Sequence, residues 1–215
     1  LRVAILTGAG ETDFSARGDL KLTMPLLTGA RKPEDEWDEE ILEHPGKFTD
    51  AILRGFELYK PVIAAVNGTA AGAGFSLAMA ADLAIAEEQA VFTMAYTNAG
   101  LSPDGSSTYF MPRKIGDRRT RELMLTNRLL AAPEALDWGV VNQVVENGAA
   151  LVAAQAMAER MAAGPTEAYA QVKRLLDASF SQTLESQMEL EARAIATQVA
   201  SADGQEGMQA FVEKR

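Results

Sequence analysis

The chain has 215 residues, 47% of them hydrophobic, and carries 20 Lys and Arg side chains against 30 Asp and Glu, a net charge of -10. This negative balance repels nucleic-acid backbones and anionic membrane surfaces, so we expect neither as a partner. The absence of cysteine excludes disulfides, thiolate metal sites and cysteine nucleophiles.

A chain of this length can bury one sizeable hydrophobic core, with a smaller extension. No apolar run approaches the roughly 18 residues of a membrane span, and the first residues show no secretory signal pattern. We therefore expect a soluble, cytoplasmic protein. The sequence opens on LRVAIL, a strand pattern that runs into a turn at TGAG, so we expect at least one strand to precede it.

Short strand patterns alternate with helical periodicity over the first two thirds of the chain. The segments with strand character are 2–6, 61–66, 82–86, 91–93 and 140–145. Between them, Phe48, Ile52, Phe56 and Tyr59 fall on one face of a helix expected over 47–59. This alternation predicts an α/β fold built from right-handed β-α units.

The last third of the chain has helical character only. After Gly148 no strand pattern recurs, and helices are expected over 149–163, 166–179, 183–200 and 204–214. Gly164 and Pro165 separate two of these helices, and the segment 201–203 separates the last two. We therefore expect a helical appendage after the strand-containing part.

The stretch between Leu20 and Lys47 has little periodicity and contains the acidic run PEDEWDEE at 33–40. Such a charge run is usually a solvated, mobile loop, and a loop this long in a compact domain can cover a pocket. His44, the only histidine, lies in this stretch, and no G-x-S-x-G motif surrounds any serine. Neither a serine-histidine-aspartate hydrolase nor a zinc site is therefore expected.

The segment GTAAGAGFSLAMAADLAIA, residues 68–86, begins with glycines and alanines and then becomes apolar. Small residues at a loop-to-helix junction let backbone N–H groups approach a ligand, which predicts an acceptor at this point. The spacing of Gly68, Gly72 and Gly74 fits neither a dinucleotide-binding loop nor a phosphate loop. Tight packing of a helix on a sheet is the alternative explanation of these glycines.

Five stretches resemble the crotonase (enoyl-CoA hydratase/isomerase) superfamily in order and spacing, over essentially the whole chain. They are LTGAGETDFSARGDL, KPVIAAVNGTAAGAGFSLAMAADLAIA, FTMAYTNAGLSPDGSSTYFMPRKIG, LAAPEALDWGVVNQVV and EGMQAFVEKR. The resemblance implies a crotonase-like spiral of β-β-α units over 1–162 and a C-terminal helical region over 163–215 that packs homotrimers or hexamers. It places Phe211 and Lys214 near a neighbouring active site. It also implies an acyl-CoA substrate, with no metal and no redox cofactor.

The same resemblance implies which backbone groups bind the thioester. By motif position, the N–H groups of Gly18 and Ala73 hold the carbonyl oxygen while an enolate forms, because fixed donors and a helix N-terminus stabilise a developing oxyanion. The carbonyl of Ala16 is expected near the CoA adenine. Arg17 is expected either at a CoA phosphate or as a solvated surface residue. Other positions expected at the substrate are Asp19, which braces its own loop, and Leu20, Gly72, Gly74, Tyr96 and Leu101.

The chain departs from the hydratases of this superfamily at their two glutamates. The matching positions hold Ser76 and Tyr96, and neither can act as a general base that activates water at neutral pH. A carboxylate stands instead at Asp104, in GLSPDGSST, where the chain resembles the branch of ring-1,2-epoxyphenylacetyl-CoA and Δ3,Δ2-enoyl-CoA isomerases. One carboxylate is enough for an isomerase, because a single base can remove a proton and return it at another carbon. We therefore expect an enoyl-CoA isomerase with Asp104 as its catalytic acid and base.

Several alternatives stay open at this point. Asp104 follows Pro103 and precedes GSSTYF, so its side chain is also a good candidate for a helix N-cap. Ser76 is interpreted as a small helix residue beside the sheet, and Trp138 as a core residue. The competing functions are hydration by altered chemistry, thioester hydrolysis, dehalogenation with Asp104 as nucleophile, and acyl-CoA binding without catalysis.

Overall fold

The computed structural model describes residues 1–16, 25–43 and 59–214. Its contacts divide the chain into two compact units. One unit comprises Ile5–Glu57 and Val62–Gln155, and the other comprises Leu1–Ala4, Leu58–Pro61 and Ala156–Arg215. The expected boundary after residue 162 stays a prediction.

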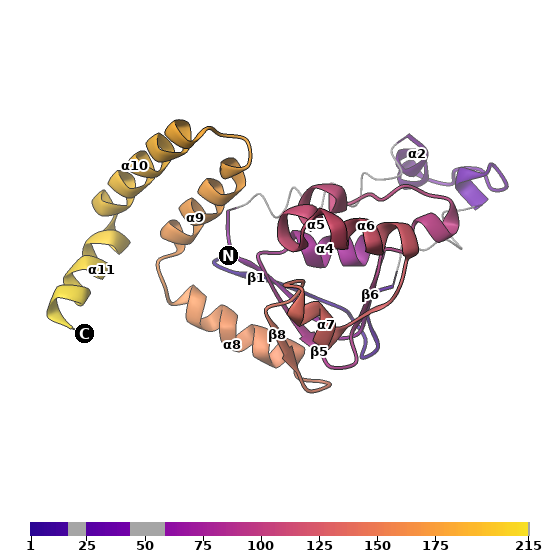
Figure 1. Ribbon diagram of the computed structural model, residues 1–215, viewed down its shortest axis with the longest axis horizontal. Helices are drawn as coiled ribbons and strands as arrows, with labels where there is room; N and C mark the ends of the chain where they lie inside the picture. Colours follow the sequence, from indigo (N-terminus) through magenta and orange to yellow (C-terminus); the bar gives the residue numbers. More distant parts are fainter. Residues whose placement is uncertain (17–24, 44–58, 215) are drawn as a thin grey trace. The chain divides into compact units, whose positions relative to one another are not determined.

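The strands form two four-stranded sheets (Figure 1). One sheet has the order β1-β3-β5-β8 and the other the order β2-β4-β6-β7. The strands are β1 (Ala4–Thr7), β2 (Asp13–Ser15), β3 (Val62–Val66), β4 (Thr69–Ala71), β5 (Leu83–Glu87), β6 (Val91–Thr93), β7 (Leu130–Ala131) and β8 (Gln143–Val145). β1 to β6 go alternately to the two sheets, and helices follow the pairs β3–β4 and β5–β6, so the predicted α/β spiral of β-β-α units is confirmed.

The strands that surround the predicted site residues are parallel. β4 pairs with β2 and with β6 in parallel, and β7 closes this sheet antiparallel to β6. In the other sheet β5 runs parallel to β3 and β8, with Ile63 opposite Leu83. Parallel neighbours end at the same edge of a sheet, so the carboxyl ends of β2, β4 and β6 lie together.

Helices follow the strand pairs and then form the C-terminal part of the chain. They are α2 (Glu36–Glu43), α4 (Ala73–Ala80), the 3-10 helix η1 (Thr97–Ala99), α5 (Ser107–Ile115), α6 (Asp117–Thr126), α7 (Ala132–Asp137), α8 (Ala150–Ala162), α9 (Thr166–Ser179), α10 (Leu184–Ala200) and α11 (Ala202–Glu213). α4 packs on β2, β3 and β4, and α5 packs on α4. Among the described residues, no helix combines the length and the apolar character needed to cross a membrane.

The hydrophobic core joins both sheets to α4. Every residue of β3 is buried, as expected for a parallel strand that is covered on both faces. The rings of Phe75 on α4 and Phe92 on β6 have centroids 5.2 Å apart and are fully buried. α4 is apolar on all sides, which fits a helix enclosed by strands and by α5.

The structure confirms the positions of the predicted strands and corrects the residues at which most of them begin or end. β6 has the predicted bounds, whereas the segment predicted over 140–145 is a strand only over Gln143–Val145. The sequence did not predict β2, β4 and β7, which have three, three and two residues. Segments this short show no alternation that could reveal a strand.

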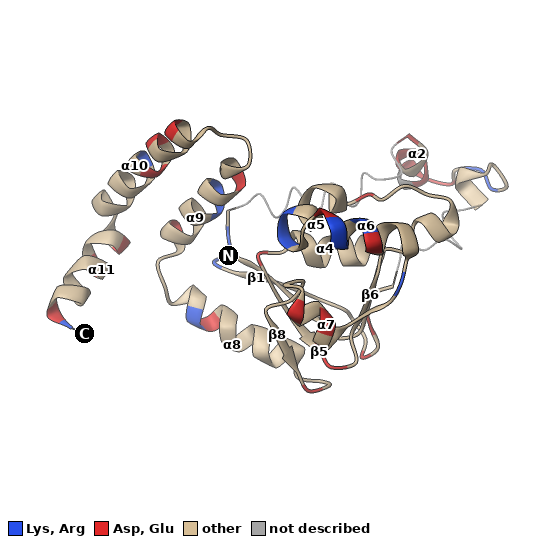
Figure 2. Cartoon of the chain, viewed as in Figure 1, with Lys and Arg blue, Asp and Glu red and all other residues tan. Residues whose placement is uncertain are grey.

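The prediction of a loop over the acidic run 33–40 is wrong, because α2 begins at Glu36 (Figure 2, acidic residues in red). The carboxylate of Asp38, 6% exposed, accepts hydrogen bonds from both Nη atoms of Arg31 and from the N–H of Glu34. Acidic residues in the first turn also suit the positive end of a helix. His44 and nearly all of the helix predicted over 47–59 lie outside the described residues.

The C-terminal helices match their predictions closely. α9 has the predicted bounds, α8 is one residue shorter than predicted at each end, and α10 begins one residue later than predicted. α11 begins two residues earlier than predicted, because Ser201 alone separates it from α10. The Oγ of Ser201 accepts a hydrogen bond from the N–H of Gly204 at 3.0 Å, which caps α11.

Candidate functional site

Three segments with predicted site residues leave neighbouring parallel strands at one edge of a sheet. β2 leads into Ala16, β4 into Gly72 and Ala73, and β6 into the loop with Tyr96. Because β2, β4 and β6 are adjacent and parallel, these segments begin side by side. The region beyond the carboxyl ends of parallel strands is where such sheets bind ligands.

Packing of backbone on backbone explains two of the three glycines in the 68–74 segment. A Cβ on Gly68 would lie 1.9 Å from the carbonyl oxygen of Thr12, and one on Gly74 would lie 2.1 Å from that of Ser15. Gly72 differs, because its φ of 55° and ψ of -120° form a conformation that side chains disfavour. This residue turns the chain from β4 into α4.

Ala73 is the first residue of α4 and is half-buried. An N–H at this position has no acceptor within the helix and lies at the positive end of the helix dipole. The N–H of Gly72, by contrast, donates to the carbonyl oxygen of Thr93 at 3.0 Å. Ala73 is therefore the candidate donor for a negatively charged oxygen at this junction.

Asp104 lies half-buried between η1 and α5, and hydrogen bonds hold its loop on two sides. Its carboxylate Oδ1 accepts a hydrogen bond from the hydroxyl of Tyr96. Its backbone carbonyl accepts from the Oγ of Ser76 at 3.2 Å and from the Oγ of Ser107 at 2.9 Å. These contacts connect the carboxylate of Asp104 to the loop after β6, and the backbone of Asp104 to α4 and α5.

The alternative in which the Asp104 side chain caps a helix is wrong. α5 begins at Ser107, and its N-cap residue is Ser106, which makes no side-chain capping bond. Asp104 contributes only its carbonyl oxygen, which accepts from the N–H of Ser107 at 3.2 Å. Sequence analysis missed Ser107, although two serines after an Asp-Gly turn are a typical signal for such local bonds.

Ser76 is fully buried and joins three parts of the candidate site. Its Oγ lies 3.1 Å from the carbonyl oxygen of Gly72, 3.4 Å from the hydroxyl oxygen of Tyr96 and 3.2 Å from the carbonyl oxygen of Asp104. Ala73 precedes Ser76 by three residues, so the two share one face of α4. The interpretation of Ser76 as a packing residue therefore missed these contacts.

Tyr96 is half-buried in the same cluster. Burial raises the pKa of its phenol above the ordinary value, and the hydrogen bond to Asp104 raises this pKa further. The phenol is therefore protonated at neutral pH and is a donor to the carboxylate.

The remaining predicted residues are exposed, differently placed or undescribed. Leu101 is 49% exposed, and Ala16 is exposed at the end of β2. Trp138, expected in the core, is instead half-buried, with the guanidinium groups of Arg119 and Arg128 each 4.8 Å from its ring centroid. Four positions lie outside the described residues, and their roles stay predictions: Arg17, Gly18, Asp19 and Leu20.

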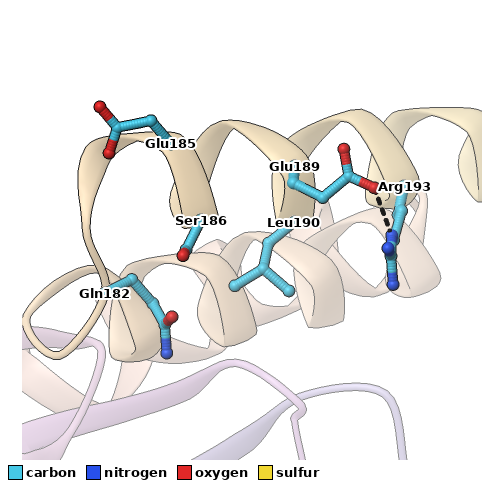
Figure 3. A pocket seen from close by; sticks show the side chains of 6 residues that line it. All are labelled: Gln182, Glu185, Ser186, Glu189, Leu190 and Arg193. Carbon is cyan, nitrogen blue, oxygen red and sulfur yellow. Dashed lines mark hydrogen bonds and ion pairs between the residues drawn. The ribbon is translucent and has the colours of Figure 1, made fainter.

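A hollow of about 420 Å³ lies against α10 and contains none of the predicted site residues (Figure 3). Its lining consists of Gln182, Glu185, Ser186, Glu189, Leu190 and Arg193. The Nε of Arg193 donates to Glu189 at 2.8 Å, an ion pair one helical turn apart of the kind that exposed helices commonly form. Within the described ranges, no cluster of three or more acidic or histidine side chains could hold a metal ion.

Comparisons with known proteins give consistent matches over the whole chain. The family model described as Enoyl-CoA hydratase/isomerase matches residues 1–215. The chain is 37% identical over 215 residues to 1,2-epoxyphenylacetyl-CoA isomerase of Escherichia coli (strain K12), covering 100% of this chain and 79% of that protein. It is 35% identical over 219 residues to carnitinyl-CoA dehydratase of Salmonella heidelberg, covering 100% of this chain and 80% of that protein. The crystal structure of an enoyl-CoA hydratase from Polaromonas sp. JS666 has a TM-score of 0.86 at 36% identity, covering 100% of this chain and 80% of that one.

Proposed function

Because the chain belongs to the enoyl-CoA hydratase/isomerase family, we propose that it is an enoyl-CoA isomerase in which Asp104 acts as the single acid and base. The names of its relatives include an isomerase, a dehydratase and a hydratase, so the choice among reactions depends on the site. The observation that supports the isomerase is the carboxylate of Asp104, bonded to Tyr96 and joined to α4 through Ser76.

The substrate in this proposal is a 3-enoyl-CoA thioester. Its carbonyl oxygen accepts hydrogen bonds from the N–H of Ala73 and, by the family resemblance, from that of Gly18. These donors stabilise the negative charge that develops on the oxygen, and one such donor typically lowers the barrier by about 3 to 4 kcal/mol. Backbone donors need no particular side chain, which fits the alanine at the start of α4.

Asp104 then moves one proton between two carbons of the substrate. Its carboxylate removes a proton from the α-carbon, and the electron pair passes into the carbonyl group to give a dienolate. The protonated Asp104 returns the proton to the γ-carbon, and the double bond ends between the α- and β-carbons. The step consumes no water and no electrons, so the proposal needs no metal and no cofactor other than the CoA of the substrate.

The neighbours of Asp104 support an isomerase over a two-carboxylate hydratase. Ser76 is fully buried and bonded to the backbone, and the raised pKa of Tyr96 keeps its phenol protonated. Neither group can activate a water molecule as a general base at neutral pH. The proposal also includes a cytoplasmic homotrimer or hexamer that has neither a nucleic acid nor a membrane as a partner.

A panel of 2- and 3-enoyl-CoA esters, followed by absorbance, tests the function. We expect the wild type to convert 3-enoyl to 2-enoyl esters, and Asp104→Asn to retain acyl-CoA binding while losing about 100-fold or more in kcat. The control Asp117→Asn removes an exposed carboxylate from α6, which is paired with Arg121, and should keep wild-type activity.

Three outcomes would contradict the isomerase. Hydration of 2-enoyl esters without isomerisation would indicate a hydratase, and full activity of Asp104→Asn would remove the proposed base. Binding of acyl-CoA esters by the wild type without turnover of any of them would indicate a binding protein.

A further inference from the structure

We infer that Tyr96 is a positioning residue, which holds Oδ1 of Asp104 so that Oδ2 is presented for proton transfer beside the start of α4. This inference rests on the proposed function, because it concerns the base of that reaction. Tyr96 acts through Asp104 and takes no part in the transfer itself.

The direction of the hydrogen bonds determines which carboxylate oxygen is engaged. The phenol of Tyr96 is protonated at neutral pH and donates to Oδ1 of Asp104. The Oγ of Ser76 lies 3.4 Å from the same phenol oxygen, and its single proton also has the carbonyl oxygens of Gly72 and Asp104 as acceptors at 3.1 and 3.2 Å. Among the described residues, Oδ2 of Asp104 has no hydrogen-bond partner. The carboxylate is therefore fixed through one oxygen while the other is left for a substrate.

The ring of Tyr96 sets the distance between the carboxylate and the first turn of α4. A Cβ on Gly72 would lie 3.6 Å from the Cζ of Tyr96, so the ring packs against the backbone just before Ala73. The backbone of Tyr96 is itself held, because its carbonyl oxygen accepts from the N–H groups of Ala99 and Leu101 at 2.9 and 3.0 Å. One aromatic side chain thus contacts the α4 junction with its ring and Asp104 with its hydroxyl.

Tyr96→Phe tests the contribution of the hydroxyl separately from that of ring packing, because the ring stays and only the hydrogen-bond donor is lost. Misplacement of a reacting group by about 1 Å can cost about 100-fold in rate, so we expect kcat to fall about 10- to 100-fold. KM should stay within about threefold, because the phenol does not bind the thioester.

The control is Tyr109→Phe, which removes the hydroxyl of a tyrosine that is 43% exposed on α5. Its kcat and KM should equal those of the wild type. Ser76 and Ser107, which bond to the Tyr96–Asp104 pair, carry no charge at any assay pH. A loss of activity in Tyr96→Phe that comes from a raised KM with an unchanged kcat would overturn the inference.

A spectrophotometric titration of the tyrosines needs no substrate and applies even if Tyr96→Phe folds poorly. In the wild type, the phenol of Tyr96 should ionise at higher pH than an ordinary tyrosine, because burial and Asp104 both raise its pKa. Asp104→Asn should bring this ionisation to lower pH, since the neighbouring negative charge is lost. An identical titration in the wild type and Asp104→Asn would overturn the inference.

The kinetic outcomes separate this inference from the proposed function. Wild-type kcat in Tyr96→Phe, together with an inactive Asp104→Asn, would overturn the inference and leave the function intact. Full activity of Asp104→Asn would overturn both.

Discussion

At the scale of single residues, the candidate site depends on the absence of side chains at the start of α4. Gly74 is the second residue of this helix, and its α-carbon lies against the carbonyl group of Ser15 at the end of β2. Any group on Gly74 would push α4 away from β2 and move the N–H of Ala73 with it. The position of the proposed oxyanion donor is therefore set by a glycine that contacts no ligand in the proposal.

Gly74→Ala is expected to lower the free energy of unfolding by about 1 to 3 kcal/mol, the usual cost of overpacking. The new Cβ would lie 2.1 Å from the carbonyl oxygen of Ser15, and the gain of up to about 1 kcal/mol from alanine in a helix is too small to offset this. Chemical denaturation measures the difference. Gly10→Ala, whose Cβ would meet no atom within 4 Å, should stay within about 0.5 kcal/mol of the wild type. Equal stability of Gly74→Ala and the wild type would contradict the close approach.

The sequence indicated which residues form the candidate site, but it did not indicate the contacts among them. Asp104 could be singled out because a carboxylate is needed for the chemistry and stands in a recognisable motif. The bonds of Ser76 could not be predicted, because its Oγ meets Tyr96 and Asp104 at separations of 20 and 28 residues. Only the packing of α4 against the loops after β6 and before α5 creates these contacts.

At the scale of elements, long helices were predictable, whereas two of the three strands that lead into the site were not. α9 has 14 residues, enough for several repeats of helical periodicity, and its bounds were predicted. β2 and β4 have three residues each and are strands because of the neighbours they pair with. Yet these two strands position Ala16 and Ala73. The part of the fold that organises the site therefore depends on tertiary pairing, which local sequence patterns do not record.

The acidic run 33–40, which leads into α2, also depends on tertiary contacts. Arg31 holds the nearly buried carboxylate of Asp38, and the N–H of Glu34 donates to the same carboxylate at 3.0 Å. Composition alone suggested a solvated loop, because the stabilising cation lies seven residues away from Asp38. The carboxylate of Asp35 also accepts from the N–H of Asp38 at 2.9 Å, so several contacts hold this charge run.

The protection of the Glu34 amide against hydrogen exchange should depend on pH. The hydrogen bond from Arg31 lowers the pKa of Asp38 in the folded chain. A pKa that is lower in the folded chain adds stability at pH values above the pKa of the unfolded chain, about 3.9. This stability is lost as the pH falls through the pKa of the folded chain. We therefore expect the protection factor of this amide to decrease when the pH is lowered below about 4.

Two variants make this measurement specific. Asp38→Asn should reduce the protection of the Glu34 amide at neutral pH as well, because the charged acceptor is gone. Glu36→Gln removes a charge from the exposed first turn of α2 and should leave the protection unchanged. Protection that persists unaltered in Asp38→Asn would show that the carboxylate does not hold this segment.

At the scale of the whole molecule, the alternation of strands between two sheets is what gathers the site. The strand pairs β1–β2, β3–β4 and β5–β6 each contribute one strand to each sheet, so segments far apart in sequence leave neighbouring strands at the same edge. Ala16, Ala73 and Tyr96 follow β2, β4 and β6 in this way. The family resemblance predicted this spiral, whereas strand patterns alone predicted only right-handed β-α units.

The C-terminal helices expose more apolar surface than a chain acting alone is expected to leave in water. None of the described residues of α10 and α11 is buried. Phe211 is 85% exposed, Val212 79% and Ile195 63%. Exposed apolar surface of this kind typically marks a protein–protein contact, and most assemblies of identical chains have closed symmetry. This surface supports the proposed homotrimer or hexamer.

Phe211→Glu tests whether α11 takes part in that assembly. Sedimentation velocity of the wild type should give a trimer or hexamer, and Phe211→Glu should shift the distribution to smaller species. In a closed assembly every copy carries the substitution, so each interface that buries this side chain would have to desolvate a new charge. Gln205→Glu adds the same charge at an exposed position of α11 without removing an apolar side chain, and it should sediment as the wild type does. A wild type that sediments as a monomer would contradict the assembly, whereas an unchanged distribution in Phe211→Glu would place this residue outside the interface.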